Sequence, residues 1–182
     1  MPKLLIGFNG RARSGKSFAA ETIDAYLRQW AFPSVGIYDI GSFILKAAID
    51  EGRLPANTKR STMTPEQLLV LIEMGRDSDR WMCATLKAMA DSKVDVGLIP
   101  NIRYPGQAAT VRAQGGFNVC CTRYNRDGSI YISSDRPAND PGETNMMSYQ
   151  SDYYISAFDG EPEWMKEQAI VLVDYLIRKV AV

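Results

Sequence analysis

The sequence of 182 residues contains no histidine and only three cysteines. Without histidine, a Ser–His–Asp triad, a Cys–His pair and most zinc sites are excluded. Cys120 and Cys121 are adjacent in an apolar run, where neighbouring side chains of a strand point to opposite faces. We therefore expect small buried thiols in a reducing compartment rather than a disulfide or a metal site.

The sequence also lacks net charge and long apolar runs. Its 21 acidic and 21 basic residues balance, which argues against a broad face for duplex DNA and leaves room for a local basic groove. No apolar run approaches the length of a membrane span, and no signal-peptide pattern opens the sequence. We expect a single domain over residues 1–182 that is cytoplasmic and has no membrane partner.

One motif carries specific chemistry. The segment Gly10-Arg-Ala-Arg-Ser-Gly-Lys-Ser17 matches G-x-x-x-x-G-K-[ST], the phosphate-binding loop. The apolar run at 4–8 predicts a buried strand before it, and the spacing over 18–27 predicts a helix after it. Strand, glycine loop and helix form the context in which backbone amides and a helix N-terminus bind phosphate.

The motif assigns a role to each of its residues. Lys16 is expected to reach the β- and γ-phosphates of ATP, and Ser17 is expected to hold Mg²⁺. Phosphoryl transfer needs no histidine, because positioning, Mg²⁺ and Lys or Arg charge carry it. The remaining cradle consists of backbone amides from Gly10, Ala12, Arg13, Ser14 and Gly15.

Strands and helices alternate along the rest of the chain. We expect strands at 34–39, 94–101, 117–122 and 151–158, and helices at 40–52, 65–74, 80–92, 106–115 and 161–180. Thr64, Pro65 and Gln67 form a capping-box pattern at one helix start. The alternation predicts an α/β fold in three layers, with a parallel five-stranded sheet between helices and ligands at the strand ends. Residues from about 124 to 150 lack periodicity and are expected to form a lid.

Four segments together resemble the bacteriophage deoxynucleoside monophosphate kinases of the P-loop kinase superfamily, which includes adenylate kinase. They are residues 10–19, residues 74–81, residues 98–105 with the helix, Gly-Gly and strand that follow up to Arg123, and Glu143 followed by residues 157–160. The resemblance spans nearly the whole chain. It implies a P-loop kinase fold, transfer of the ATP γ-phosphate to a deoxynucleoside monophosphate, an acceptor-binding helical region at about 40–92 and, for a phage-encoded protein, the host cytoplasm.

Two positions depart from the family pattern. Asn101 stands where the family has an aspartate before x-Arg, and Asp140-Pro-Gly-Glu143 stands where the family lid has a histidine. Asn101 keeps a carbonyl that can ligate Mg²⁺ but brings no charge. Either acceptor specificity has drifted, or another acid handles the metal.

Basic residues in the helical region and beyond are candidates for the acceptor phosphate. Arg76 and Arg80 are spaced i, i+4 and would share one helix face, with salt bridges as the alternative. Arg103 follows the central strand and is expected to contact phosphate. Asp39 ends the second strand. Its carboxylate is expected either to bind the acceptor or to cap the helix that follows. Lys46 is an acceptor-phosphate candidate whose alternative is a surface lysine.

The resemblance extends the candidates to the lid and the last turn. Arg123 ends the fourth strand, where adenylate-like kinases place an arginine that packs on the nucleotide base, and Asp159 lies in the turn before the last helix. Both are expected beside ATP. Arg126 and Arg136 are lid candidates for transition-state charge, with a solvated loop as the alternative. Asp174 follows an apolar run at helical spacing, so we place it on the final helix.

Three functions stay open at this point. A deoxynucleoside monophosphate kinase is favoured, because arginines give an acceptor phosphate its own anion pocket. A second possibility keeps the chemistry and takes a hydroxymethylated pyrimidine base within DNA as the acceptor. A third, motivated by Asn101, is a nucleotide-binding protein without turnover. A homodimer is one assembly that the sequence allows.

Overall fold

The computed structural model describes residues 2–29, 34–134 and 139–180. Its strands are β1 (Leu4–Asn9), β2 (Val35–Ile37), β3 (Val96–Ile99), β4 (Phe117–Tyr124) and β5 (Tyr153–Phe158). Its helices are α1 (Lys16–Gln29), α2 (Ile40–Asp50), the 3₁₀ turn η1 (Arg60–Thr62), α3 (Pro65–Met74), α4 (Ser78–Ser92), α5 (Pro105–Ala113), α6 (Pro141–Thr144) and α7 (Pro162–Val180). All five expected strands are therefore present.

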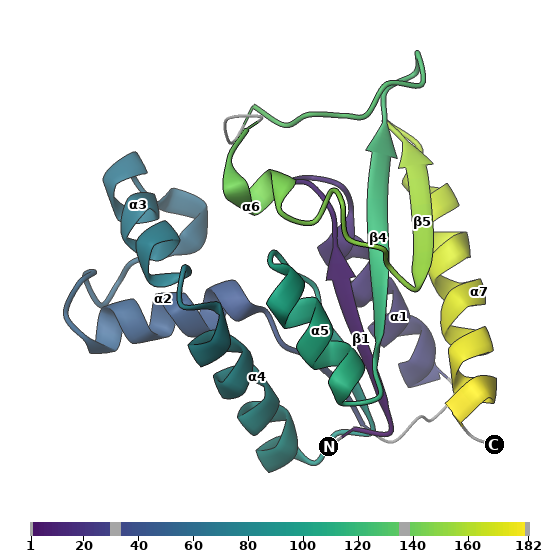
Figure 1. Ribbon diagram of the computed structural model, residues 1–182, viewed down its shortest axis with the longest axis horizontal. Coiled ribbons are helices and arrows are strands. Elements are labelled where there is room, and N and C mark those ends of the chain that lie inside the picture. The colour runs from purple at the N-terminus through teal and green to yellow at the C-terminus, as the bar shows by residue number, and fades with distance from the viewer. Residues whose placement is uncertain (1, 30–33, 135–138, 181–182) are drawn as a thin grey trace.

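The strands form one parallel sheet in the order β2-β3-β1-β4-β5. The central strand β1 pairs with β3 on one side and β4 on the other. Helices α1 and α7 cover one face of the sheet and α5 covers the other, while α2, α3 and α4 form an arm that shares a hydrophobic core with α5 (Figure 1). The predicted three-layer α/β fold is confirmed, and the carboxyl ends of all strands meet at one edge.

Alternation along β1 supplies two hydrophobic cores. Leu4, Ile6 and Phe8 point toward α1 and α7, whereas Leu5 points into the core shared by α2, α3, α4 and α5. This two-sided burial explains why the strand is a continuous apolar run. Because both cores contact β1, the segment that follows Asn9 starts from a fixed position.

The helical arm is shaped by caps that the sequence predicts only in part. At α3 the capping box of Thr64 and Gln67 is confirmed. Helix α4 begins at Ser78, two residues before the expected start, because the Asp77 side chain caps it by accepting from the Arg80 backbone. Arg76 therefore lies between two helices, and the expectation that it shares a helix face with Arg80 is wrong.

The lid, residues 124–150, contains local structure. Tyr124 bridges to Ile130, and the short helix α6 lies near the lid's far end. After α6 the chain is fastened to α5, because Arg112 donates to the Gln150 carbonyl at 2.6 Å. Arg136, a predicted catalytic residue of the lid, lies outside the described residues.

The fold also bears on the position of Asp174 and on the question of membrane-spanning helices. Asp174 lies on α7, where it accepts a hydrogen bond from the Tyr26 hydroxyl at 2.9 Å, so its placement on the final helix is confirmed. Within the described part of the chain, no helix combines the length and the apolar character that crossing a bilayer demands.

The core around β3 generates a stability prediction. Leu98 is fully buried in the central sheet, whereas Leu69 on α3 is 63% exposed. Leu98→Ala should lower the free energy of unfolding by about 2–5 kcal/mol, because the buried part of the leucine side chain beyond Cβ is lost and a cavity remains. The matched variant Leu69→Ala should change it by less than about 0.5 kcal/mol. Urea denaturation measures both, and equal effects would contradict the assigned packing of β3.

Candidate active site

The loop between β1 and α1 holds three residues in the left-handed region. Gly10, Arg13 and Gly15 have φ values of 128°, 61° and 95°. A Cβ on Gly10 would collide with the Cys121 carbonyl, and one on Gly15 would collide with the Met165 sulfur. Only glycine fits these two positions. Successive backbone N–H groups in such turns form a concave anion site, which here adjoins the N-terminus of α1.

Lys16 is folded back onto this loop and is 6% exposed. Its ammonium donates to the carbonyls of Gly10 at 2.9 Å and Arg11 at 2.5 Å. Burial, together with the positive charge of Arg103, lowers the pKa of Lys16 to about 8. The charge is held at the loop, where an anionic ligand would stabilise it.

A carboxylate from the lid accepts a hydrogen bond from one backbone amide of the loop. The Ala12 backbone N–H donates to Glu143 Oε2 at 2.5 Å, and Arg103 Nη1 donates to Glu143 Oε1 at 3.2 Å. The Glu143 side chain is only 5% exposed. The loop thus binds an anionic oxygen in this structure, and its donor set fits the phosphates of a nucleotide.

A cleft of about 750 Å³ opens beside the loop. Ser17 lines the cleft together with Asp39 and Asn101, which follow the ends of β2 and β3. Asn101 donates its amide N–H to Asp39, so the Asn101 carbonyl oxygen is the atom left for a cation. Among the described residues, no group of three or more His, Cys, Asp or Glu side chains converges to hold a metal ion.

Asp39 serves as the N-cap of α2. Its carboxylate accepts from the Gly41 backbone at 3.2 Å and from the Ser42 hydroxyl at 2.9 Å, and it pairs with Arg60 at 2.6 Å. The N-cap alternative is confirmed. Since the same carboxylate lines the cleft, its role toward an acceptor stays a prediction.

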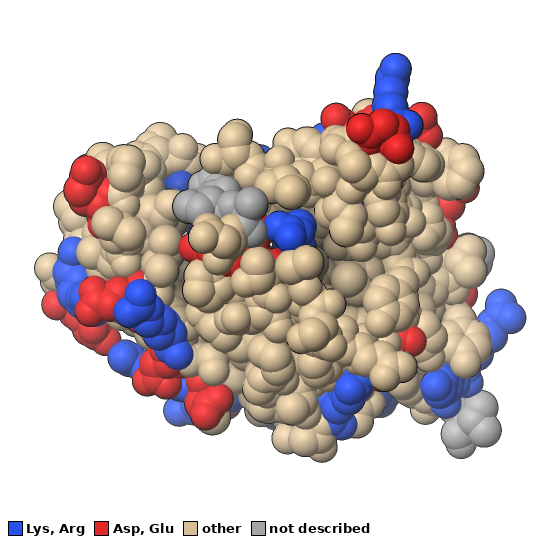
Figure 2. Space-filling view, turned by 45° about the horizontal axis from the view of Figure 1, so that its top comes forward, with Lys and Arg blue, Asp and Glu red and all other residues tan. Residues whose placement is uncertain are grey.

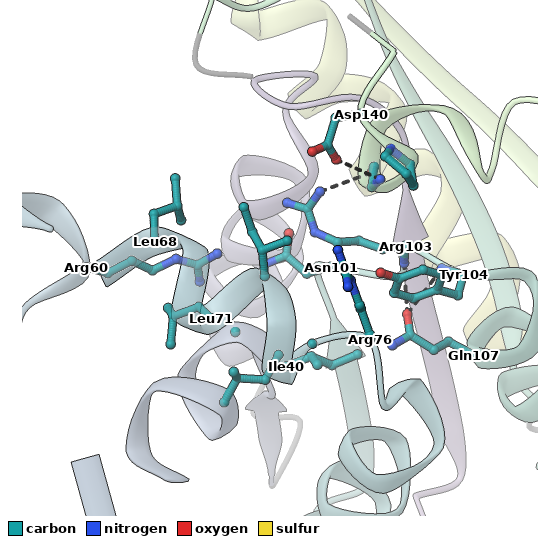
Figure 3. Close-up of a pocket in the computed structure, with 16 residues that line it drawn as sticks. Ile40, Arg60, Leu68, Leu71, Arg76, Asn101, Arg103, Tyr104, Gln107 and Asp140 are labelled. Carbon is teal, nitrogen blue, oxygen red and sulfur yellow. Dashed lines mark hydrogen bonds between the residues drawn. The ribbon is translucent and has the colours of Figure 1, made fainter. Parts of the chain in front are cut away.

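A second cavity of about 180 Å³ adjoins the cleft (Figure 3). Arg60, Arg76 and Arg103 reach it from three different segments, and the Arg76 guanidinium makes no ion pair with any other described side chain. Arg60, Leu68, Asn101 and Arg103 line both spaces, so the cavity opens onto the phosphate loop. The apolar part of its wall is Ile40, Ile44, Leu68, Leu71 and Ile72.

Two predicted anion-binding residues point elsewhere. Arg80 pairs with Glu51 at 2.7 Å and lies over the Trp81 ring, and Lys46 pairs with Asp50 at 2.5 Å. Neither lines the cleft or the adjoining cavity. The catalytic assignment of Arg80 is therefore not supported, because its guanidinium is already paired on the outer side of the arm.

Arg123 and Asp159 form an ion pair beside the phosphate loop. The Arg123 guanidinium lies 4.3 Å from the centre of the Tyr131 ring and donates to the Arg13 carbonyl at 3.4 Å. A cavity of about 360 Å³ adjoins them, with Phe18 also on its wall. The structure brings these predicted residues together, and their contact with a nucleotide base stays a prediction.

Two residues of the site were not singled out from the sequence. Arg60 lies in a polar loop that carries no pattern. Gln107 lies in the first turn of α5, where its carbonyl oxygen accepts from the backbone N–H groups of Arg103 and Tyr104 at 2.9 and 3.3 Å. This contact fixes the direction in which Arg103 leaves β3. The spacing of four residues between Arg103 and Gln107 is the one feature of the sequence that could have indicated this contact.

Comparisons with known proteins support the fold. No protein-family model and no curated protein matches the sequence. Two structures of APS kinase from Mycobacterium tuberculosis, a Cys556Ala mutant and a complex with AMPPNP and APS, match with a TM-score of 0.50 at 19% and 18% identity. Each match covers 97% of this chain and 99% of that chain. Shikimate kinase from Aquifex aeolicus matches with a TM-score of 0.46 at 13% identity. The chain has the α/β fold of the P-loop kinases.

The buried lysine generates a pH-dependent prediction. Because the pKa of Lys16 falls from 10.5 to about 8 on folding, the unfolded chain binds more protons between these values. The contribution of Lys16 to stability therefore rises with pH across this window. Lys16→Met should melt at a higher temperature than the wild type below pH 8, and the gap should narrow toward pH 10. Differential scanning calorimetry at pH 7 and pH 9.5 measures it, and a constant gap would contradict the burial of a charged lysine.

Proposed function

We propose that this protein is an ATP- and Mg²⁺-dependent kinase that transfers the γ-phosphate to a deoxynucleoside monophosphate. The observation that carries the proposal is the arginine-lined cavity opening onto the phosphate-loop cleft. A monophosphate acceptor needs an anion site of its own, whereas an uncharged alcohol does not. The resemblance to bacteriophage deoxynucleoside monophosphate kinases supports the same acceptor.

The phosphate loop is the donor site in this proposal. Its amides and Lys16 hold the phosphates of ATP, and the pair of Arg123 and Asp159 receives the base. A structure of the APS kinase neighbour is a complex with AMPPNP, which supports a nucleotide as a ligand of this fold. Mg²⁺ would be held by the Ser17 hydroxyl, the Asn101 carbonyl oxygen, phosphate oxygens and waters, a ligand set that this cation accepts. When bound, Mg²⁺ neutralises charge on the phosphates.

The adjoining cavity is the acceptor site. Arg76 and Arg60 bind the acceptor phosphate, and the apolar wall receives the base and sugar. An oxygen of the acceptor phosphate attacks the γ-phosphorus, a new P–O bond forms, and the bond to the β-phosphate oxygen breaks to release ADP. Arg103 lines both spaces, so it can offset the charge that moves from donor to acceptor.

The charge distribution bears on a polymeric acceptor. On the face in Figure 2, Lys and Arg are mixed with Asp and Glu over the α2–α4 arm, and no broad single-signed area covers it. This pattern does not favour a duplex-binding face. DNA carrying hydroxymethylated pyrimidines is therefore included among the acceptors in the experiment that follows.

The test is transfer of the labelled γ-phosphate of ATP to a panel of acceptors in the presence of Mg²⁺. The panel contains deoxy- and ribonucleoside monophosphates and DNA with hydroxymethylated pyrimidines, and Lys16→Ala is the inactive control. Label in one or more deoxynucleoside monophosphates is the expected result. Label only in DNA would replace the proposed acceptor, and ATP binding without transfer would contradict the kinase.

The acceptor site generates a mutational prediction. Arg76→Ala should raise the KM for the monophosphate about tenfold, because one charge-assisted contact is lost, while kcat changes less. Arg80→Ala removes the same charge four residues away, where the side chain pairs with Glu51, and should leave KM within about twofold. Steady-state kinetics of both variants measures the difference. Equal effects would remove Arg76 from the acceptor site.

A further inference from the structure

The contact between Glu143 and the phosphate loop joins segments 131 residues apart. Glu143 lies on the short helix α6, whose start is fixed by the Asp140 carboxylate accepting from the Gly142 backbone at 2.7 Å. Three residues later Met146 is buried in the core of the helical arm. The chain on both sides of Glu143 is therefore anchored, and the side chain is directed onto the loop.

The groups around the Glu143 carboxylate are those that an anionic ligand requires. One oxygen accepts from the Ala12 amide at 2.5 Å, and the other accepts from Arg103 at 3.2 Å. The negative charge of Glu143 also opposes the lowering of the Lys16 pKa, so the two charges interact across the loop. A backbone amide, an arginine and the loop lysine thus surround a buried carboxylate.

A second anion cannot use these donors at the same time. The Ala12 N–H is committed to one acceptor, and two negative charges this close together in a partly buried site repel each other. In this motif the lysine reaches the β- and γ-phosphates, and here the Lys16 ammonium lies on the Gly10 and Arg11 carbonyls, next to the Ala12 amide. A ligand whose terminal phosphate lies at this end of the loop must displace Glu143. A ligand shorter by one phosphate leaves that end to the carboxylate.

We propose that Glu143 is a specificity-determining residue that distinguishes nucleoside triphosphate from diphosphate. The carboxylate stands in for the terminal phosphate of the donor and is displaced only by a triphosphate. Displacement also ends the ion pair between Glu143 and Arg103, whose guanidinium donates to the Gly142 carbonyl at 3.1 Å as well and lines the acceptor cavity. This second consequence rests on the proposed kinase function, whereas the discrimination between triphosphate and diphosphate requires only the phosphate loop.

The direct test is calorimetric titration of AMPPNP and of ADP into the wild type and Glu143→Gln. The variant keeps the shape and an oxygen acceptor for Ala12 while it removes the charge. We expect the Kd of AMPPNP to fall about tenfold, as the loss of one buried repulsion implies, and the Kd of ADP to fall less than about threefold. Glu167→Gln, an exposed change of the same charge on α7, should alter neither Kd by more than about twofold.

The result that overturns the proposal is an equal change for both ligands, or no change for AMPPNP. A second titration follows Arg103. In the wild type, saturating AMPPNP should lower the Kd of the deoxynucleoside monophosphate, and in Glu143→Gln this coupling should shrink toward none. A monophosphate that binds to neither protein would count against the proposed acceptor, and the comparison of AMPPNP with ADP would still decide the role of Glu143.

Discussion

The left-handed turns of the phosphate loop are the constraint on which the rest of the site depends. Gly10 and Gly15 both have positive φ values, and a side chain at Gly10 would collide with the Cys121 carbonyl of β4, so these two turns require glycine. That conformation turns backbone amides toward one region and brings the first turn of α1 beneath it. Both hydrophobic cores contact β1, and the sheet therefore sets where the loop begins.

Charge balance around the loop explains the arrangement of the neighbouring residues. Lys16 carries a buried positive charge whose pKa is lowered to about 8, and Arg103 adds a second cation nearby. Two cations at a partly buried site favour an anion between them, and Glu143 supplies one from the lid. A phosphate would meet the same need, in line with the proposed donor site. In the proposal above, the position of the lid therefore depends on the charge of the ligand, because both act through the Glu143 carboxylate.

The sequence predicts most of the fold and the centre of the site. The phosphate loop, the five strands and the capping box at Thr64 follow from local patterns, since each is set by neighbouring residues. Arg80 could not be placed, because the Asp77 cap moved the helix start and Glu51 is distant in sequence. Arg60 carries no pattern, and the Glu143 contact depends on how the lid folds back over the loop.

The most direct test of the account is a crystal structure with AMPPNP and the monophosphate that the panel identifies. We expect the triphosphate in the loop with an oxygen at the Ala12 amide, Glu143 displaced from that amide, and the monophosphate between Arg60, Arg76 and Arg103. Nucleotide bound with Glu143 still on Ala12, or a monophosphate outside this cavity, would contradict it.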